Sequence, residues 1–124
     1  MNHYLLDTHI LLWWLIDDPK LDQRARDLIA NPATRVLVSV VSIWEIVIKK
    51  SLGKLTCPDN LKELLQENDF TTLPLVADHV LQVPELPAIH ADPFDRLLIA
   101  QSIVEDMPLI TRDRIIPLYE LKCL

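Results

Sequence analysis

Residues 3–16 read HYLLDTHILLWWLI, in which a single acid, Asp7, separates a short apolar run from a longer one. The run before Asp7 has the length of a buried strand. Residues 8–16 have the length and composition of a helix, and Asp17-Asp18-Pro19 interrupts the apolar pattern after them. This stretch therefore predicts a strand that ends at Asp7 and leads directly into a helix.

The same alternation of short apolar runs and helical segments continues along the chain. Further strands are predicted at 36–39, 108–111 and 118–121, with 70–75 either a strand or an extended connection. Helices are predicted at 21–30, 41–52, 58–68, 76–83 and 93–106. Strands that alternate with helices favour an α/β fold, in which helices cover both faces of a parallel sheet and ligands bind at the carboxyl ends of its strands. The 124 residues suffice for one domain with its own core, spanning 1–124.

The composition narrows the functional classes. With 50% hydrophobic and 24% charged residues, the chain has the profile of a compact soluble protein. Because it contains one glycine, folds that bind nucleotides through a glycine-rich loop are disfavoured. The apolar run near the start is too short for a membrane span and lacks a basic segment before it, so we expect a cytoplasmic protein with no membrane partner. Cys57 and Cys123 lack the spacing of a zinc site and are expected to be reduced thiols, with a disulfide as the alternative.

The charged residues are unevenly distributed. A formal net charge of −6 argues mildly against a nucleic-acid partner, because phosphate binding usually depends on Lys and Arg. Acids concentrate at 59–85, however, whereas Lys49, Lys50 and Lys54 form a predicted basic patch. The net charge therefore does not exclude a basic binding surface.

The stretch 89–100, IHADPFDRLLIA, places two acids before an apolar helical run. Asp92 has the features of an N-cap, since Pro93 follows it at the first helical position. Asp95 then lies in the first turn, where the helix dipole favours an acid. The alternative is that Asp95 is directed into a cleft that holds further carboxylates. His90 is either an ordinary loop histidine or a residue near such a cleft.

Three further acids follow predicted strands or interrupt an apolar run. Asp7 and Asp113 each follow a strand, where Asp is also common as a turn or capping residue. Glu45 interrupts the apolar run VVSIWEIVI, where an unpaired ionised carboxylate would be costly to bury. On a helical projection Ser42, Glu45 and Lys49 form one narrow polar stripe on a helix otherwise predicted to be buried. Glu45 either faces solvent and pairs with Lys49, or faces the other acids.

Asp7, Glu45, Asp95 and Asp113, taken together, predict a metal site. Carboxylates that converge from separate elements repel one another unless a cation lies among them. A set of oxygen donors without cysteine is typical of Mg²⁺ or Mn²⁺ rather than zinc. Such an ion suits phosphodiester hydrolysis, because it activates water and neutralises the scissile phosphate. RNA can then bind a negatively charged protein, with its flanking phosphates held by Arg96, Arg112 or the lysine patch.

Four stretches of the chain form a further pattern: LLDTHILLW at 5–13, SVVSIWEIVIK at 39–49, LPAIHADPFDRLLIAQS at 86–102, and PLITRD at 108–113 followed by LYELK at 118–122. Together they resemble the PIN-domain ribonucleases, and specifically the VapC-type toxins of bacterial toxin–antitoxin pairs. The stretches occur in the order of the family and cover nearly the whole chain, and HADPFDRLLIAQ is the most specific of them. The usual glycine before the last core strand is replaced here by Glu105-Asp106-Met107-Pro108.

The resemblance implies a three-layer α/β/α sandwich with a mainly parallel sheet, and Mg²⁺- or Mn²⁺-dependent endoribonuclease activity. It also implies a small antitoxin that blocks the acidic site, and a homodimer. The implied catalytic acids are Asp7, Glu45, Asp95 and Asp113, of which Asp7, Asp95 and Asp113 hold the metal. Thr111 matches the hydroxyl that orients the last acid, Thr8 and Ser42 are supporting candidates, and Arg96, Arg112 and Lys49 are candidates for substrate binding.

Two other functions use the same residues. In the first, the protein is a non-catalytic module whose acidic pocket binds an Arg or Lys of a partner protein, and metal binding would distinguish it from the nuclease. In the second, the site transfers phosphoryl groups, as in receiver or phosphatase domains. The second is less well supported, because those sites need another acid close to Asp7 and LLDTHI has none.

Overall fold

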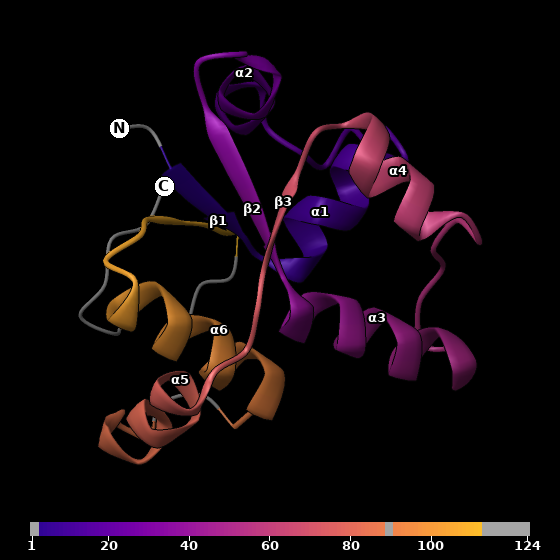
Figure 1. Cartoon of the computed structure of the whole chain (residues 1–124). Coiled ribbons are helices and arrows are strands. Elements are labelled where there is room, and N and C mark those ends of the chain that lie inside the picture. The colour runs from indigo at the N-terminus through magenta and orange to yellow at the C-terminus, as the bar shows by residue number, and fades with distance from the viewer. Residues whose placement is uncertain (1–2, 89–90, 113–124) are drawn as a thin grey trace.

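The computed structural model describes residues 3–88 and 91–112. Its strands are β1 (His3–Leu6), β2 (Arg35–Ser39), β3 (Thr71–Leu73) and β4 (Leu109–Ile110). Its helices are α1 (Thr8–Leu15), α2 (Gln23–Ala30), α3 (Val40–Ser51), α4 (Leu61–Glu67), α5 (Ala77–Gln82) and α6 (Pro93–Val104), and a 3₁₀ turn, η1 (Val83–Glu85), follows α5 (Figure 1). His90, Asp113 and the strand predicted at 118–121 lie outside the described residues.

The elements predicted within this part of the chain are confirmed, most of them with shorter ends. The segment 70–75 contains a strand, β3. The helix predicted at 76–83 ends at Gln82, because Pro84 lacks the N–H that another helical turn would need, and Val83 begins η1 instead. Within residues 3–88 and 91–112, no helix combines the length and apolar character needed to cross a membrane.

The described strands form one parallel sheet in the order β3-β2-β1-β4. In this sheet Leu5 pairs with Leu37 on one side and with Leu109 on the other. The chain moves outward from β1 to β2 and β3, and then returns to place β4 on the opposite side of β1. The direction of the connections therefore reverses between β1 and β4. Such a reversal creates a crevice at the carboxyl ends of the strands, where α/β proteins usually bind ligands.

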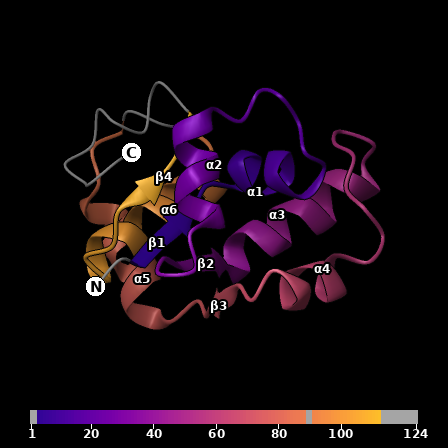
Figure 2. The ribbon, with the colours of Figure 1, turned by 90° about the horizontal axis from the view of Figure 1, so that it is seen from above.

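Helices cover both faces of the sheet, because successive strand residues point to opposite sides. One hydrophobic cluster contains Leu5 and Leu109 and packs against α6. The other contains Leu6 and Ile110 and packs against α1 and α2. Figure 1 shows α5 and α6 on one side of the strands and α1 and α4 on the other, and Figure 2 shows the strands from above between α2 and α5. The predicted three-layer α/β/α architecture is therefore confirmed.

Two helices begin where neighbouring strands end. Asp7 follows β1 and accepts a hydrogen bond from the N–H of His9, which makes it the N-cap of α1. Ser39 is the last residue of β2, and its hydroxyl accepts a hydrogen bond from the N–H of Val41 at the start of α3. The N-termini of α1 and α3 thus lie at the same edge of the sheet, beside the crevice.

Aspartates take the left-handed turn positions that glycine occupies in most proteins. Asp17, Asp69 and Asp106 have φ angles of 53°, 56° and 49°, and follow α1, α4 and α6, respectively. Aspartate tolerates this conformation better than most residues, because its short side chain bonds locally. Gly53, at 71°, ends α3 in the same way. Asp106 therefore makes the turn before β4 in the segment that lacks the usual glycine.

The burial predicted for α3 is wrong in part. Outside its polar stripe the helix was expected to be buried, but Trp44 is 50% exposed and Val47 is 59% exposed. Of the two orientations considered for the stripe, exposure to solvent is excluded, because Ser42 and Glu45 are buried. The reason is that α3 leaves the carboxyl end of β2 beside α1, so the stripe faces the crevice of the sheet. Helical projection describes which residues share a side of the helix, but not which side the rest of the protein covers.

A chain of buried polar side chains joins the end of β2 to α5 and α6. The hydroxyl of Ser39 donates to Oε1 of Gln101 at 2.5 Å, and Nε2 of Gln101 lies 3.3 Å from Nδ1 of His79. Nδ1 also accepts the N–H of Val76, so the proton of a neutral His79 ring lies on Nε2, which contacts Glu105 at 2.8 Å. These bonds satisfy polar groups that could not otherwise be buried.

Replacing Gln101 with Leu is expected to lower the free energy of unfolding by about 2–3 kcal/mol, because the hydroxyl of Ser39 and Nδ1 of His79 each lose a buried partner. Urea denaturation measures this loss. Gln66 is exposed on α4, and Gln66→Leu is the matched control, with an expected change within about 0.5 kcal/mol. Equal stability of the two variants would contradict a structural role for the network.

Candidate functional site

The crevice between β1 and β4 holds the first candidate acid. Leu6 pairs with Ile110, and Asp7 and Thr111 directly follow this pair. The N–H of Asp7 donates to the carbonyl of Ile110 at 3.0 Å, which extends the pairing by one residue. Asp7 is 4% exposed and Thr111 is 7% exposed, so both side chains lie at the base of the crevice rather than on the surface.

Hydrogen bonds orient both carboxylate oxygens of Asp7. Oδ2 accepts from the hydroxyl of Thr111 at 2.6 Å, and Oδ1 accepts from the N–H of His9 at 3.3 Å. The family resemblance assigned Thr111 to the last acid, Asp113. A threonine hydroxyl has one proton, and in the described part of the chain it is donated to Asp7, which lies 104 positions earlier.

Glu45 lies in a second group of buried oxygens, on α3. It is 2% exposed, and its Oε1 accepts from the hydroxyl of Thr8 at 2.7 Å. The hydroxyl of Ser42 is 2.9 Å from that of Thr8. Because the single proton of Thr8 is donated to the carboxylate, Ser42 donates to Thr8. Thr8 is the neighbour of Asp7, so the first turn of α1 connects the two acids.

Lys49 contacts the other oxygen of Glu45. Its Nζ lies 2.5 Å from Oε2 of Glu45 and 3.6 Å from Oδ2 of Asp92. Burial by itself would lower the pKa of Lys49, but the hydrogen bond to Glu45 and the negative charges of Glu45, Asp92 and Asp95 outweigh it and raise the pKa above its ordinary value. The ammonium therefore lies within an acidic group that includes residues of α3 and α6.

The start of α6 places Asp92 and Asp95 beside α3. Asp92 is the N-cap, as predicted, because its Oδ1 accepts from the N–H groups of Phe94 and Asp95 at 2.8 and 3.4 Å. The ring of Phe94 packs edge-on against Trp44 with 5.0 Å between ring centroids, and this contact fixes α6 against α3. Asp95 is half-buried, and its charge acts on Lys49.

The prediction of a basic patch free of acids is wrong, because two of its three lysines form ion pairs. Lys49 pairs with Glu45, and Lys50 pairs with the exposed Asp59 at 2.6 Å. Lys54 is exposed. The sequence did not reveal the second pair because Asp59 follows Lys50 by nine positions, beyond the reach of a helical contact.

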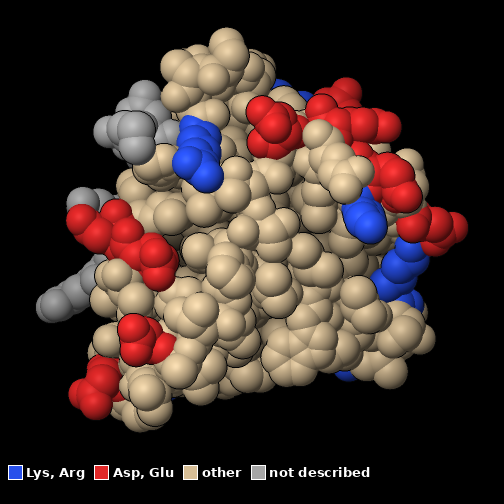
Figure 3. Space-filling model, viewed as in Figure 1, with Lys and Arg blue, Asp and Glu red and all other residues tan. Residues whose placement is uncertain are grey.

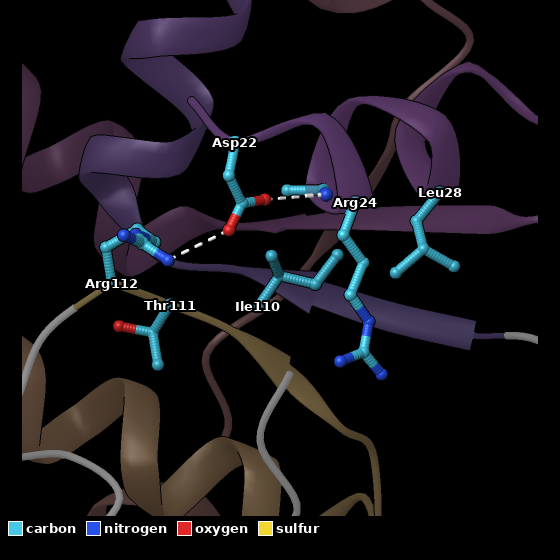
Figure 4. A pocket seen from close by; sticks show the side chains of 7 residues that line it. Asp22, Arg24, Leu28, Ile110, Thr111 and Arg112 are labelled. Carbon is cyan, nitrogen blue, oxygen red and sulfur yellow. Dashed lines mark hydrogen bonds and ion pairs between the residues drawn. The ribbon is translucent and has the colours of Figure 1, made fainter. Parts of the chain in front are cut away.

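Two arginines expected to bind substrate are held by other groups. Arg96 donates to the carbonyls of Val83 and Pro87 at 3.1 and 3.2 Å. Arg112 pairs with Asp22, the N-cap of α2, at 2.8 Å. Figure 4 shows Asp22 and Arg112 at a cavity of about 160 Å³ that begins beside Thr111.

Arg24 lines the same cavity, although no sequence pattern indicates it. Its signal was weak, because Arg24 lies in an amphipathic helix with no motif around it. Figure 4 shows its side chain extending from α2 past Ile110. Arg24 and Arg112 thus bring two guanidinium groups to one cavity next to the crevice.

The donors in the crevice are of the kind that a hard divalent cation prefers. Asp7, Glu45 and Asp95 supply carboxylates, and no cysteine is near them. Cys57, the one cysteine within the described ranges, is a free thiol whose pKa is raised by burial. Within residues 3–88 and 91–112, no three His, Cys, Asp or Glu side chains are close enough to hold an ion. The type of donor fits Mg²⁺ or Mn²⁺ rather than zinc, but the described residues by themselves do not form a complete metal site.

Comparisons with known proteins agree on the fold. Residues 4–121 match the family described as the PIN domain. The chain is 28% identical over 121 residues to Ribonuclease VapC22 of Mycobacterium tuberculosis (strain ATCC 25618 / H37Rv), with 92% of this chain and 89% of that protein covered.

Two solved structures share this architecture. The DNA-bound VapBC of Salmonella typhimurium matches with a TM-score of 0.73 and 14% identity, covering 100% of this chain and 98% of that one. VapBC2 of Rickettsia felis, bound to a DNA fragment from the promoter, matches with a TM-score of 0.68 and 16% identity, covering 98% and 97%. At these identities the likeness concerns the fold alone.

Replacing Thr8 with Val is expected to lower the free energy of unfolding by about 1–3 kcal/mol, because the variant keeps the shape but removes the donor to the buried Glu45 carboxylate. Urea denaturation of the metal-free protein measures the loss. Thr72 is exposed on β3, and the same substitution there is expected to stay within about 0.5 kcal/mol. If Thr8→Val were as stable as Thr72→Val, the hydroxyl would not support Glu45.

Proposed function

Because the chain belongs to the PIN domain family, we propose that it is a metal-dependent endoribonuclease and the toxin of a toxin–antitoxin pair. The observation that carries the proposal is the position of Asp7. It lies at the carboxyl end of β1, at the point where the connections of the sheet reverse, and Thr111 holds its carboxylate. A relative named as a ribonuclease VapC and structural neighbours named as VapBC support the same function.

The proposed metal ligands are Asp7, Asp95 and Asp113, with Mg²⁺ or Mn²⁺ as the ion. When bound, the ion would activate water and neutralise charge on the scissile phosphate. Glu45 completes the acidic group or orients the attacking water. In this assignment the protein's part is positioning, since Thr111 fixes Asp7 and Thr8, supported by Ser42, fixes Glu45.

The RNA would run across the crevice, flanked by basic side chains. In this proposal Arg112, with Arg24 at the same cavity, contacts a phosphate next to the scissile one, and the phosphate replaces Asp22 as the partner of Arg112. The second partner in the proposal is a small antitoxin protein that covers the acidic site. We place this activity in the cytoplasm, where cellular RNA is the substrate.

The test is incubation of the purified, antitoxin-free protein with total cellular RNA, followed by mapping of new 5′ ends. Cleavage is expected with Mg²⁺ or Mn²⁺ and not with EDTA. Asp7→Asn and Asp95→Asn are each expected to lower the rate at least about 100-fold, because loss of a supporting residue beside a metal ligand already costs 10- to 100-fold. The matched control is Asp78→Asn, which removes an exposed acid on α5 and should cleave at the normal rate.

Three outcomes of this assay carry different conclusions. Cleavage that survives both Asp→Asn substitutions would disprove the assigned site. Absence of cleavage with tight metal binding would indicate a narrow substrate range. Absence of both cleavage and metal binding would favour the non-catalytic module, whose acidic pocket binds a basic side chain of a partner protein.

A homodimer is the second part of the proposal, and the exposed side of α3 supports it. Val40, Trp44 and Val47 follow one another at helical spacing and are 38%, 50% and 59% exposed. Figure 3, viewed as in Figure 1, shows few charged side chains at the centre and lower right of the molecule, the region where α3 lies in Figure 1. Contiguous exposed apolar patches mark interaction surfaces, and we propose that this side of α3 is one.

Val47→Glu is expected to convert the dimer into a monomer, because it places a charge on the apolar side of α3, at its most exposed member. Light scattering after size-exclusion chromatography gives the mass. Gln66→Glu adds the same charge at an exposed position of α4 and should leave the dimer intact. A Val47→Glu protein that remains dimeric would exclude this side of α3 as the interface.

A further inference from the structure

The acidic crevice already contains a positive charge that belongs to the chain. Nζ of Lys49 lies 2.5 Å from Oε2 of Glu45 and 3.6 Å from Oδ2 of Asp92, and the charge of Asp95 also acts on it. The Lys49 side chain is 28% exposed and that of Glu45 is 3% exposed. The ammonium therefore reaches from the rim of the crevice to a carboxylate at its base.

The ammonium of Lys49 supplies the counter-charge that the buried carboxylate of Glu45 requires. A buried carboxylate without a counter-charge is strongly unfavourable, and hydroxyl donors reduce the cost only in part. Thr8 supplies one hydrogen bond, and within the described residues Lys49 is the only cationic side chain in ion-pair contact with Glu45. The ion-free site thus depends on Lys49 for its charge balance.

We propose that Lys49 is a tethered counter-cation: it neutralises Glu45 in the absence of a divalent ion and competes with that ion for the same carboxylate. This inference rests on the proposed function, because it takes Glu45 as part of the metal site. It also changes the role of Lys49, which the sequence suggested as a substrate contact. In this role Lys49 sets the ion concentration at which the site fills.

The structure provides a place for the ammonium once an ion has taken its position. Oδ2 of Asp92 already lies 3.6 Å away, while Oδ1 caps α6. The ring of Phe94 is 5.7 Å from Nζ and offers a cation–π contact. Lysine also has the flexible side chain that such a movement needs. Lys49 can therefore leave Glu45 without losing every favourable contact.

The adjacent lysine supplies a matched control. Lys50 lies on the same helix and carries the same charge, but it pairs with Asp59, whose side chain is fully exposed, outside the crevice. Removing Lys50 changes the net charge as much as removing Lys49 does. A difference between the two variants therefore reports on the local pair and not on the overall field of the protein.

The test is a calorimetric titration of the full-length, metal-free chain with MnCl₂, at fixed pH and ionic strength. Lys49→Met is expected to bind Mn²⁺ roughly 5- to 50-fold more tightly than the natural protein, as in other pairs of coupled binding events. Lys50→Met is expected to stay within about twofold of the natural protein. Unchanged or weaker binding by Lys49→Met, or equal tightening by Lys50→Met, would overturn the proposal.

Thermal unfolding gives a second readout. Without Mn²⁺, Lys49→Met should have a lower Tm than the natural protein, because Glu45 loses its counter-charge. Saturating Mn²⁺ should raise the Tm of this variant by more than it raises that of the natural protein. If Lys49→Met does not fold without the ion, Lys49→Gln, which retains a donor, takes its place. An equal rise of Tm in variant and natural protein would count against competition.

A variant of Glu45 tests whether the competition acts through that carboxylate. In a Glu45→Gln background, Lys49→Met should change the affinity for Mn²⁺ by less than about twofold, because no carboxylate remains to be shared. A full effect in this background would overturn the assignment. These readouts do not include RNA cleavage. Failure to cut RNA by a protein that passes the titration bears on the proposed function alone, and an active nuclease whose affinity for Mn²⁺ is insensitive to Lys49 refutes only this inference.

Discussion

The parallel pairing of β1 with β2 on one side and with β4 on the other is the constraint on which the remaining structure depends. It places the carboxyl ends of three strands at one edge, and it makes β1 the point where the connections reverse. Asp7 ends β1, caps α1 and directs a carboxylate into the crevice. Ser39 ends β2 and caps α3 in the same way. The residues that end the strands also cap the helices, and one of them, Asp7, belongs to the candidate site. This double use explains how a chain of 124 residues can position several acids.

Burial of the acids explains the hydroxyl groups around them. Thr111 and Thr8 each donate to a carboxylate oxygen, and Ser42 donates in turn to Thr8. Within the described part of the chain no buried side-chain nitrogen or oxygen is without a partner. A carboxylate held by fixed donors needs little rearrangement when a cation arrives, so the site is preorganised by the same bonds that make its burial tolerable.

Local patterns predicted most of the fold, because strand length, helical periodicity and capping chemistry are encoded within a few residues. Asp92 before Pro93 is such a case, and the structure confirms the cap. The pairing of Thr111 with Asp7 joins residues 104 positions apart, and no local pattern contains it. The exposure of Trp44 and Val47 was missed for a related reason, since the side of α3 that faces the protein is decided by where β2 ends.

The pair formed by Glu45 and Lys49 shows that the same sequence spacing can contribute very different amounts to the free energy of folding, depending on burial. A Glu followed by a Lys four positions later is common on exposed helices, where the pair contributes about 0.2–0.5 kcal/mol. Here the carboxylate is almost fully buried, so removing the lysine leaves a charge in a medium that solvates it poorly, at a cost of about 3–5 kcal/mol for pairs of this kind. The spacing is the same in both settings. The difference comes from the sheet, which directs this stripe of α3 into the crevice, and the pair therefore belongs to the site rather than to the surface.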